Sequence, residues 1–293
     1  MGQEGSEIIL PKLESVGVVG RSILVRADLD LPDGGKNASR LRAAQEVVKY
    51  LREHKAERIK VIGHKGHISL VSLLGVDINW DLRADPREEQ NSEELAAELA
   101  LGFDVYVNEA FATSHRKHAS IDALPRLMKS RGQPVCVGLR FAKEVQVLSP
   151  ITSGLVIIGG AKSSDKAGYA DELEKKGFKV LRGGLLPGVK LRQDGLDISD
   201  ETISSFKLQI SNSQVIVVAG PMGKYEQDDC GATQEVFTAV ANSSAYKIAG
   251  GGDTQAALEK YGLEKKFDWI SIGGGAMLEF LATGTLPGIE ALV

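Results

Sequence analysis

The chain has 293 residues, of which 43% are hydrophobic and 25% charged, a composition typical of a soluble globular protein with room for two ordinary domains. Its formal net charge of −4 provides no overall basic surface, so we expect no nucleic-acid partner. It contains no apolar run long enough to span a bilayer, and we therefore expect no membrane partner.

The cysteines and the N-terminal residues bear on the compartment. Cys136 and Cys230 stand alone, without CxxC or other metal-type spacing, which fits a reducing compartment. The N-terminus has no signal-peptide pattern, and its formal match to a myristoylation signal, Met-Gly-x-x-x-Ser, is short enough to arise by chance. We therefore expect a cytoplasmic protein.

In the first half of the chain, short runs of β-forming residues alternate with helical segments. The segment 40–54 carries a helical stripe of apolar residues. The segment 92–102 begins at a candidate N-cap, Ser92, and ends at Gly102. Strands are predicted at 22–29, 58–63, 104–110 and 134–139.

The second half repeats this alternation. A helix is predicted at 254–262, whereas the glycine-rich and poorly periodic stretch 177–198 indicates mostly loop. Strands that are apolar throughout and separated by helices indicate parallel sheets covered on both faces. We therefore predict an α/β fold of two lobes, connected by a helix over 141–148 that ends before Pro150. The strands of the second lobe are predicted at 155–160, 214–223, 246–252 and 269–275.

The residues that follow each strand differ between the two halves, and ligands of open parallel sheets bind at these strand ends. Glycine lets backbone N–H groups approach an anion closely, which suits a polyphosphate. Arginine and histidine side chains suit a small and strongly anionic molecule. The pattern therefore predicts an enzyme with two substrates. First-half strands end in charged or histidine side chains, namely Arg26, Asp28, Asp30, His64, Lys65, His67, His115, Arg116, Lys117 and His118, and second-half strands end in Gly159, Gly160, Gly220, Gly223 and the glycines at 250–252 and 273–275.

Three motifs in these loops leave alternatives open. Lys162 and Lys166 share one face of a helix that starts near Ser163, either as a solvated face or as phosphate ligands. Asp253 follows three glycines, either as a helix N-cap or as a ligand of Mg²⁺ beside a polyphosphate. Neither a GxxxxGK(S/T) nor a GxGxxG motif follows any predicted strand, which disfavours a standard P-loop or a dinucleotide site.

Four of the five histidines form two HxxH pairs, at positions 64 and 67 and at positions 115 and 118. Zinc is one interpretation of such pairs. The cations Lys65, Arg116 and Lys117 lie inside or beside them and oppose a bound metal ion, so the sequence favours an anion site.

Several longer motifs stand in the order found in phosphoglycerate kinases, and the chain resembles that family from end to end. VRADLDLP (25–32) is similar to the family's Val-Arg-Val-Asp-Phe-Asn-Val-Pro, and DVYVNEAFATSHRKHAS (104–120) to its Asp-Val-Tyr-Val-Asn-Asp-Ala-Phe-Gly-Thr-Ala-His-Arg-Ala-His-Ala-Ser. GGAKSSDK, GPMGKYE (220–226), GGGDT (250–254), SIGGGAMLEFL and LPGIEAL resemble the corresponding family segments.

The resemblance implies two Rossmann-like lobes and reversible phosphoryl transfer between 1,3-bisphosphoglycerate and ADP, giving 3-phosphoglycerate and ATP with Mg²⁺. It implies a 3-phosphoglycerate lobe at 1–140, a connecting helix and hinge at 141–153, and a nucleotide lobe at 154–275 that is followed by a segment, 276–293, returning to the first lobe. We expect these small-molecule substrates as partners and a monomer.

The same resemblance assigns individual residues. The substrate ligands would be Asp28, Asp30, Arg40, His64, His67, Arg83 and Arg116. The nucleotide ligands would be Gly160, Lys162, Lys166, Glu226, Gly251, Gly252, Asp253 and Thr254, with Asp253 also holding the metal. Arg40 and Lys162 would be catalytic, because phosphoryl transfer depends mainly on positive charge around the migrating group.

The chain also departs from the family pattern. It is shorter than the usual member, with the largest loss in 177–198, which borders the adenine pocket. Asp30 stands where the family has Asn, His67 where it has Arg, and Ala219 where it has Asn. We favour an active kinase, keep a nucleotide- or metabolite-binding homologue without efficient turnover as the alternative, and disfavour a Rossmann oxidoreductase because its fingerprint is absent.

Overall fold

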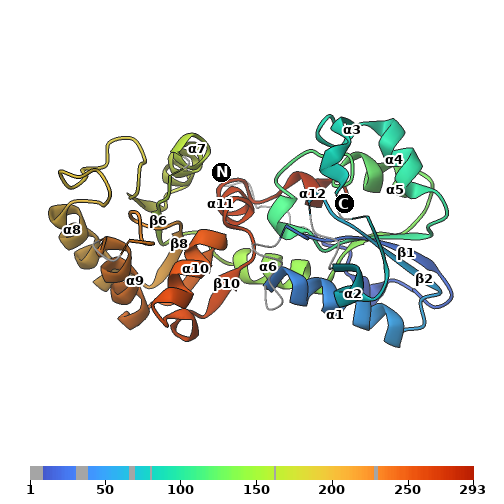
Figure 1. The fold of residues 1–293 in the computed structure, drawn as a ribbon, viewed down its shortest axis with the longest axis horizontal. Helices are drawn as coiled ribbons and strands as arrows, with labels where there is room; N and C mark the ends of the chain where they lie inside the picture. The colour runs from blue at the N-terminus through green and yellow to red at the C-terminus, as the bar shows by residue number, and fades with distance from the viewer. Residues whose placement is uncertain (1–8, 31–38, 66–69, 80, 162, 228–229) are drawn as a thin grey trace, which may run out of the picture. The chain divides into compact units, whose positions relative to one another are not determined.

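In the computed structural model, the chain divides into two compact units. The structure describes residues 9–30, 39–65, 70–79, 81–161, 163–227 and 230–293. The first unit comprises residues 1–146 together with 285–293, and the second comprises residues 147–284. Each unit has one five-stranded parallel sheet with helices on both faces (Figure 1). The predicted α/β fold with two parallel sheets is therefore confirmed.

The sheet of the first unit has the strand order β3-β2-β1-β4-β5. Its central strand β1 is buried from Ile23 onward, and helix α1 packs the apolar side chains Val47 and Leu51 into the same core. Figure 1 shows α1 and α2 on one side of the sheet and α3, α4 and α5 on the other. Its elements are η1 Leu13–Ser15, β1 Ser22–Arg26, α1 Ser39–Glu53, β2 Arg58–Ile62, α2 Leu70–Leu74, β3 Asp77–Asn79, η3 Leu82–Ala84, α3 Pro86–Glu89, α4 Glu93–Ala100, β4 Val105–Asn108, η4 Phe111–Thr113, α5 Ala123–Ser130, β5 Val135–Val137, α6 Leu139–Leu148 and α12 Pro287–Glu290.

The sheet of the second unit has the order β10-β9-β8-β6-β7. Its central strands β6 and β8 carry β-branched side chains into a core that includes Phe206 and Phe237. In Figure 1, α8, α9 and α10 cover one face, and α7 and α11 cover the other. Its elements are β6 Leu155–Ile158, α7 Ser163–Lys175, β7 Lys179–Arg182, α8 Asp200–Ser211, β8 Val215–Ala219, α9 Ala232–Asn242, β9 Tyr246–Gly250, α10 Gly252–Lys260, η5 Glu264–Lys266, β10 Trp269–Ser271 and α11 Gly274–Thr283.

The stretch 177–198 is mostly loop, as predicted, but it contains one strand that was not predicted. Residues 179–182 form β7, which pairs in parallel with β6 at the edge of the sheet. The strand is short and only its Leu181 is fully buried, so its apolar signal is weak. The equally short β3 was also not predicted, and of its three residues only Ile78 is buried.

The C-terminal segment that joins the first unit is shorter than the predicted 276–293. Residues 276–284 belong to the second unit, because α11 packs against α7 and β9 and ends at Gly284 in the left-handed conformation. From Thr285 onward the chain belongs to the first unit. There the Gly288 N–H donates to the Ser114 carbonyl oxygen at 2.9 Å, and Ile289 is fully buried.

The helix that the sequence analysis placed at 141–148 begins slightly earlier. It is α6, and the boundary between the two units falls inside it, after Gln146. The buried carboxylate of Glu109 accepts the N–H groups of Arg140 and Phe141, at 2.8 and 3.4 Å, which satisfies otherwise unpaired donors at the start of this helix. Burial, partly opposed by these hydrogen bonds, raises the pKa of Glu109 well above its ordinary value.

Candidate active site

The second unit has a cavity of about 430 Å³ at the ends of its strands. Gly160 follows β6, Gly184 follows β7 and Pro221 follows β8, so the cavity lies at the edge of a parallel sheet where ligands bind. The predicted residues Glu226 and Asp253 also line it. Its other lining residues are Ala161, Leu185, Leu191, Gly195, Leu196, Met222, Gly223, Lys224 and Tyr225.

Two glycine-ended strands approach each other closely beside this cavity. Gly220 has a φ of +103°, and a Cβ there would collide with the carbonyl oxygen of Gly159. The Lys166 ammonium donates to that same oxygen at 2.5 Å and lies 2.6 Å from the Cβ position of Gly160. The helix α7 that carries Lys166 begins at Ser163, as predicted. The glycines therefore make room for both the neighbouring backbone and a lysine side chain.

Thr254 fixes the ends of β8 and β9 relative to each other. Its buried hydroxyl accepts the Gly220 N–H at 2.7 Å and donates to the Gly250 carbonyl oxygen at 2.8 Å. The interpretation of Asp253 as a helix N-cap is wrong, since Gly251 occupies that position with a φ of +99°. Asp253 lies instead in the first turn of α10, with its side chain exposed at the cavity.

One corner of the cavity is acidic. Burial and the nearby carboxylates of Glu226 and Asp253 raise the pKa of the Tyr225 hydroxyl. Both carboxylates are exposed, and among the described residues neither forms an ion pair. They are available to a hydroxyl-bearing or metal-bearing ligand.

The opposite wall of the cavity is apolar and comes from the stretch 184–196. Leu185 and Leu196 are 52% and 37% exposed, unusual for leucine, and both line the cavity. The neighbouring Asp197 anchors this loop, because its buried carboxylate accepts the Ala232 N–H at 2.8 Å. The sequence analysis did not identify Leu185, Leu191 or Leu196 as cavity residues.

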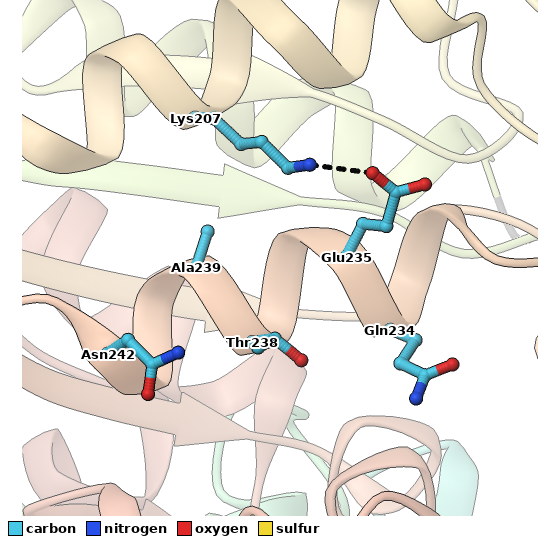
Figure 2. Close-up of a pocket in the computed structure, with 6 residues that line it drawn as sticks. All are labelled: Lys207, Gln234, Glu235, Thr238, Ala239 and Asn242. Carbon is cyan, nitrogen blue, oxygen red and sulfur yellow. Dashed lines mark hydrogen bonds and ion pairs between the residues drawn. The ribbon is translucent and has the colours of Figure 1, made fainter.

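A second cavity of the same unit, of about 380 Å³, has a different character. Figure 2 shows that it lies along α9 and that Lys207 of α8 pairs with Glu235 beside it. This ion pair, at 2.6 Å, occupies the two charged side chains among its lining residues. The cavity at the strand ends is therefore the better candidate for an anionic ligand.

In the first unit, a buried polar network begins at Asp28, two residues after β1. The Asp28 carboxylate accepts from the Ala112 N–H and from the Thr113 hydroxyl, both at 2.8 Å. Arg26 is fully buried and donates to the Ser120 hydroxyl at 2.8 Å and to the Ala27 carbonyl oxygen at 2.6 Å. The network joins β1 to the loops after β4 and fixes the floor of the predicted anion site.

The network continues to Glu88, which is fully buried in α3. Its carboxylate accepts from the Ser120 hydroxyl at 2.6 Å and from the Ser120 N–H at 2.9 Å. Burial alone would raise the pKa of Glu88, but the His64 ring, the Arg26 charge and the Ser120 hydrogen bonds outweigh it and lower the pKa to about 2. The His64 Nδ1 atom is 3.7 Å from the Glu88 carboxylate, beyond hydrogen-bonding distance.

His64 and Arg83 meet beside this network. The Arg83 N–H donates to the His64 carbonyl oxygen at 2.8 Å, and both side chains lie 3.6 Å from Oε1 of Glu89. The His64 ring lies tilted against that of His118, with the ring centroids 4.7 Å apart, and the pKa of His118 is lowered to about 4, chiefly by burial. Arg116 is exposed nearby, and its charge contributes to this lowering.

The remaining predicted residues of the first unit are Asp30 and Arg40. Both side chains are at least partly exposed, and the Arg40 guanidinium donates to the Asp30 carbonyl oxygen at 3.1 Å. Lys162 and His67 lie outside the described residues. The buried Arg26, Glu88 and Ser120 were not among the predicted site residues, because their pairing joins positions at least 32 apart in the sequence.

Comparison with known proteins identifies the family. The family model for phosphoglycerate kinase matches residues 80–192 and 187–284. The chain belongs to the phosphoglycerate kinase family. Its activity class is accordingly that of a phosphotransferase with a carboxyl group as acceptor, as the resemblance implied.

Individual phosphoglycerate kinases match over nearly their whole length. The enzyme of Herpetosiphon aurantiacus is 30% identical, covering 96% of this chain and 98% of the relative. That of Thermomicrobium roseum is 29% identical, covering 93% and 96%. The second alignment extends over 384 positions, more than this chain has residues, so the relative contains segments with no counterpart here. The two ranges matched by the family model meet at 187–192, inside the stretch where the sequence analysis located the missing segment.

Solved structures support the fold. The phosphoglycerate kinase of Pyrococcus horikoshii has a TM-score of 0.80 at 23% identity, covering 97% of this chain and 98% of that one. The structure from Coxiella burnetii has a TM-score of 0.77 at 22% identity, with the same coverage. Among the described residues, no helix combines the length and the apolar character needed to cross a membrane.

Proposed function

We propose that this chain catalyses reversible phosphoryl transfer between 1,3-bisphosphoglycerate and ADP, with the nucleotide in the second unit and 3-phosphoglycerate in the first. The observation that carries this proposal is the cavity at the strand ends of the second unit, which Gly160, Glu226 and Asp253 line together. The family membership of the chain supports the same reaction.

The cavity offers each part of a nucleotide a suitable partner. The exposed Leu185 and Leu196 give an apolar surface for a base. The Glu226 carboxylate suits ribose hydroxyls, and the glycine-ended strands bring backbone N–H groups within reach of phosphate oxygens. We assign Lys166, Gly251, Gly252 and Thr254 to the phosphates or to the loop that holds them.

Asp253 fits a role in holding Mg²⁺ with the nucleotide. Its carboxylate is exposed at the cavity, in the first turn of α10 and close to the glycine-ended strands. Mg²⁺ prefers oxygen ligands and is commonly held by one or two carboxylates together with substrate phosphates. When bound, the ion would neutralise charge on the phosphates, while Asp253 and the backbone around Gly251 keep them in place.

The first unit suits a small anionic acid. We assign Asp28 and Asp30 to the glycerate hydroxyls, and Arg40, His64, His67, Arg83 and Arg116 to its phosphate and carboxyl oxygens. Asp28 is held by two hydrogen bonds, whereas Arg83 and Arg116 are exposed, with Arg83 lying 3.6 Å from Glu89. Arg40 and Lys162 supply positive charge to the migrating phosphoryl group, which needs no general base because the acceptor is already an oxygen anion.

A coupled assay with 3-phosphoglycerate and MgATP tests the proposal. We expect turnover in the parent chain and a loss of about 100- to 1000-fold in Arg40→Ala and Lys162→Ala. Arg126→Ala and Lys207→Ala serve as controls, because these cations pair with Asp122 and Glu235 away from the assigned residues. Nucleotide binding without turnover in the parent would instead establish the alternative of a binding homologue, which Asp30 and the shortened 177–198 stretch favour.

We also propose a monomeric, cytoplasmic protein whose partners are these small molecules. Both sets of assigned residues come from a single chain, and the formal charge of −4 offers nothing to a nucleic acid. Light scattering of the purified protein should give the mass of one chain, 31.4 kDa, and a mass of twice that value would contradict it.

A further inference from the structure

Three side chains of the first unit place metal-binding atoms close together outside the nucleotide cavity. His64 follows β2, Glu88 lies in α3 and His118 lies after η4. The Glu88 Oε1 atom is 3.7 Å from His64 Nδ1 and 3.8 Å from His118 Nδ1, and all three ligand atoms lie within 4.8 Å of one another. Each residue is less than a tenth exposed, so the cluster is buried.

The histidine nitrogens of this cluster have no hydrogen-bond partner among the described residues. Both ring nitrogens of His64 and Nδ1 of His118 are buried without one. A buried polar atom without a partner costs free energy, so such atoms call for an explanation. A metal ion at the centre of the cluster would satisfy one nitrogen of each ring.

Neighbouring side chains hold the ligands of the cluster in place. Ser120 holds both carboxylate oxygens of Glu88 in place. The Nε2 atom of His64 lies 3.6 Å from Oε1 of Glu89, so the ring directs its other nitrogen at a carboxylate. A carboxylate that hydrogen-bonds a metal-binding histidine fixes the orientation of the ring and increases its basicity, and Glu89 would reach this role by a small shortening of that distance.

We propose that His64, His118 and Glu88 form a binding site for one divalent transition-metal ion of the kind that prefers imidazole, with Zn²⁺ as the representative. Two histidines and one glutamate are an established ligand set for zinc with an open fourth position. Zinc bonds of about 2.0–2.1 Å in tetrahedral geometry place ligand atoms roughly 3.3 Å apart. The distances of 3.7 and 3.8 Å therefore need only a small adjustment of the side chains.

The local charge distinguishes between metals. The carboxylates of Glu88 and Glu89 lie at the cluster, together with the cations Arg26, Arg83 and Arg116. A hard cation such as Mg²⁺ or Ca²⁺, which depends on several charged oxygen ligands, gains little where the carboxylates are offset by these cations. Zn²⁺, Co²⁺ and Ni²⁺ bind neutral imidazole well. The sequence analysis favoured an anion site over zinc at an HxxH pair. The proposed ligands are instead one histidine from each of the two pairs, completed by a distant glutamate.

The proposed site shares His64 with the assigned 3-phosphoglycerate ligands. A bound metal ion would withdraw the His64 ring from the substrate, so the ion and 3-phosphoglycerate should compete. This consequence rests on the proposed function, whereas metal binding by the cluster does not.

The test is titration of the tag-free, metal-free full chain with Zn²⁺ by calorimetry, without substrate, repeated with Co²⁺ to record the visible absorption bands of its four-coordinate form. We expect one ion bound per chain, undisturbed by millimolar Mg²⁺. His118→Gln and Glu88→Gln should each weaken Zn²⁺ binding at least about tenfold. Even the loss of a residue that only hydrogen-bonds a metal ligand lowers metal affinity about 10- to 100-fold. His54→Gln is the matched control, because His54 stacks on Tyr50 outside the cluster.

The result that would overturn the site is a parent chain that binds no Zn²⁺, or one that binds it no more tightly than His118→Gln does. Circular dichroism checks that the variants fold. If Glu88→Gln fails to fold, His118→Gln decides the question, since the backbone hydrogen bonds at residue 118 do not involve its ring. Competition between Zn²⁺ and 3-phosphoglycerate is measured separately, so failure of the proposed function would leave the metal result intact.

Discussion

In the first unit the strand ends present Arg26, Asp28 and His64, whereas in the second unit β6 and β8 end in Gly159 and Gly220. The first candidate site depends on where side chains are held, by buried hydrogen bonds such as those from Ala112 and Thr113 to Asp28. The second depends on how closely the backbone at Gly220 and the Lys166 side chain approach the backbone at Gly159. The two sites should therefore be sensitive to different kinds of substitution: loss of a functional group in the first, addition of a methyl group in the second.

The largest effect should come from Gly220→Ala. The added Cβ would collide with the Gly159 carbonyl oxygen and would occupy a positive-φ conformation, which costs about 1–3 kcal/mol. We expect ADP affinity, measured by calorimetry, to fall about 5- to 100-fold. Gly168→Ala is the matched control, because nothing lies within 4 Å of the Cβ position of this helical glycine. Equal ADP affinity in Gly220→Ala and the parent would contradict a site built from close backbones.

The reciprocal test removes the same charge at two positions of the first unit. Asp28→Asn replaces one of the two accepting carboxylate oxygens by an NH₂ group, which cannot accept a hydrogen bond from Ala112 or Thr113. The free energy of unfolding should therefore fall by about 1–3 kcal/mol, and 3-phosphoglycerate should bind more weakly. Asp30 is exposed, and Asp30→Asn should leave stability unchanged while raising 3-phosphoglycerate affinity by up to about fivefold. Urea unfolding and calorimetry measure both quantities. Equal effects of the two substitutions on stability and on 3-phosphoglycerate affinity would contradict a site that depends on buried hydrogen bonds to Asp28.

A pH-dependent effect is expected at Glu109 of the first unit. Burial raises the folded-state pKa of Glu109 above its ordinary 4.5, so folding favours the protonated carboxyl. The stabilising contribution is complete below pH 4.5 and is lost as the pH rises toward the folded pKa. Glu109→Gln, which stays neutral, should gain stability relative to the parent as the pH rises above 4.5. Urea unfolding at a series of pH values checks this, and a constant difference would show that Glu109 is ionised in the folded chain.

The smallest effects should be alike in the two units. Ser92 caps α4 by accepting the Leu95 N–H, and Ser199 caps α8 by accepting the Thr202 N–H. Ser92→Ala and Ser199→Ala should each lower the free energy of unfolding by about 1 kcal/mol. Hydrogen exchange should assign the loss to the first unit for Ser92→Ala and to the second for Ser199→Ala. A loss distributed over both units in either variant would mean that they unfold as one.

The sequence was informative where one residue determines local structure. Apolar runs revealed the central strands, Ser92 revealed a helix start, and glycines after β6, β8 and β9 revealed the edge that holds the cavity. It was uninformative for β3 and β7, which are short and lie at sheet edges with few buried side chains. Periodicity needs several buried residues to be visible, and these strands have one each.

The buried hydrogen-bond partners of the site residues could also not be predicted from the sequence. Ser120 and Glu88 are 32 positions apart, and their hydrogen bonds exist only because α3 and the loop after η4 fold against each other. The apolar wall of the cavity, with Leu185 and Leu196, depends in the same way on Asp197 holding the start of α9. Such pairings follow from tertiary packing, which single-sequence patterns do not encode.

The return of residues 285–293 to the first unit bears on how the chain is made. During synthesis on the ribosome, residues 1–146 emerge first, yet Gly288 and Ile289, which pack beside Ser114, emerge only after the whole second unit. The first unit, to which we assign 3-phosphoglycerate, is thus the first to be synthesised but the last to be completed. A nascent chain stalled before Thr285 would carry a complete second unit and an unfinished first one.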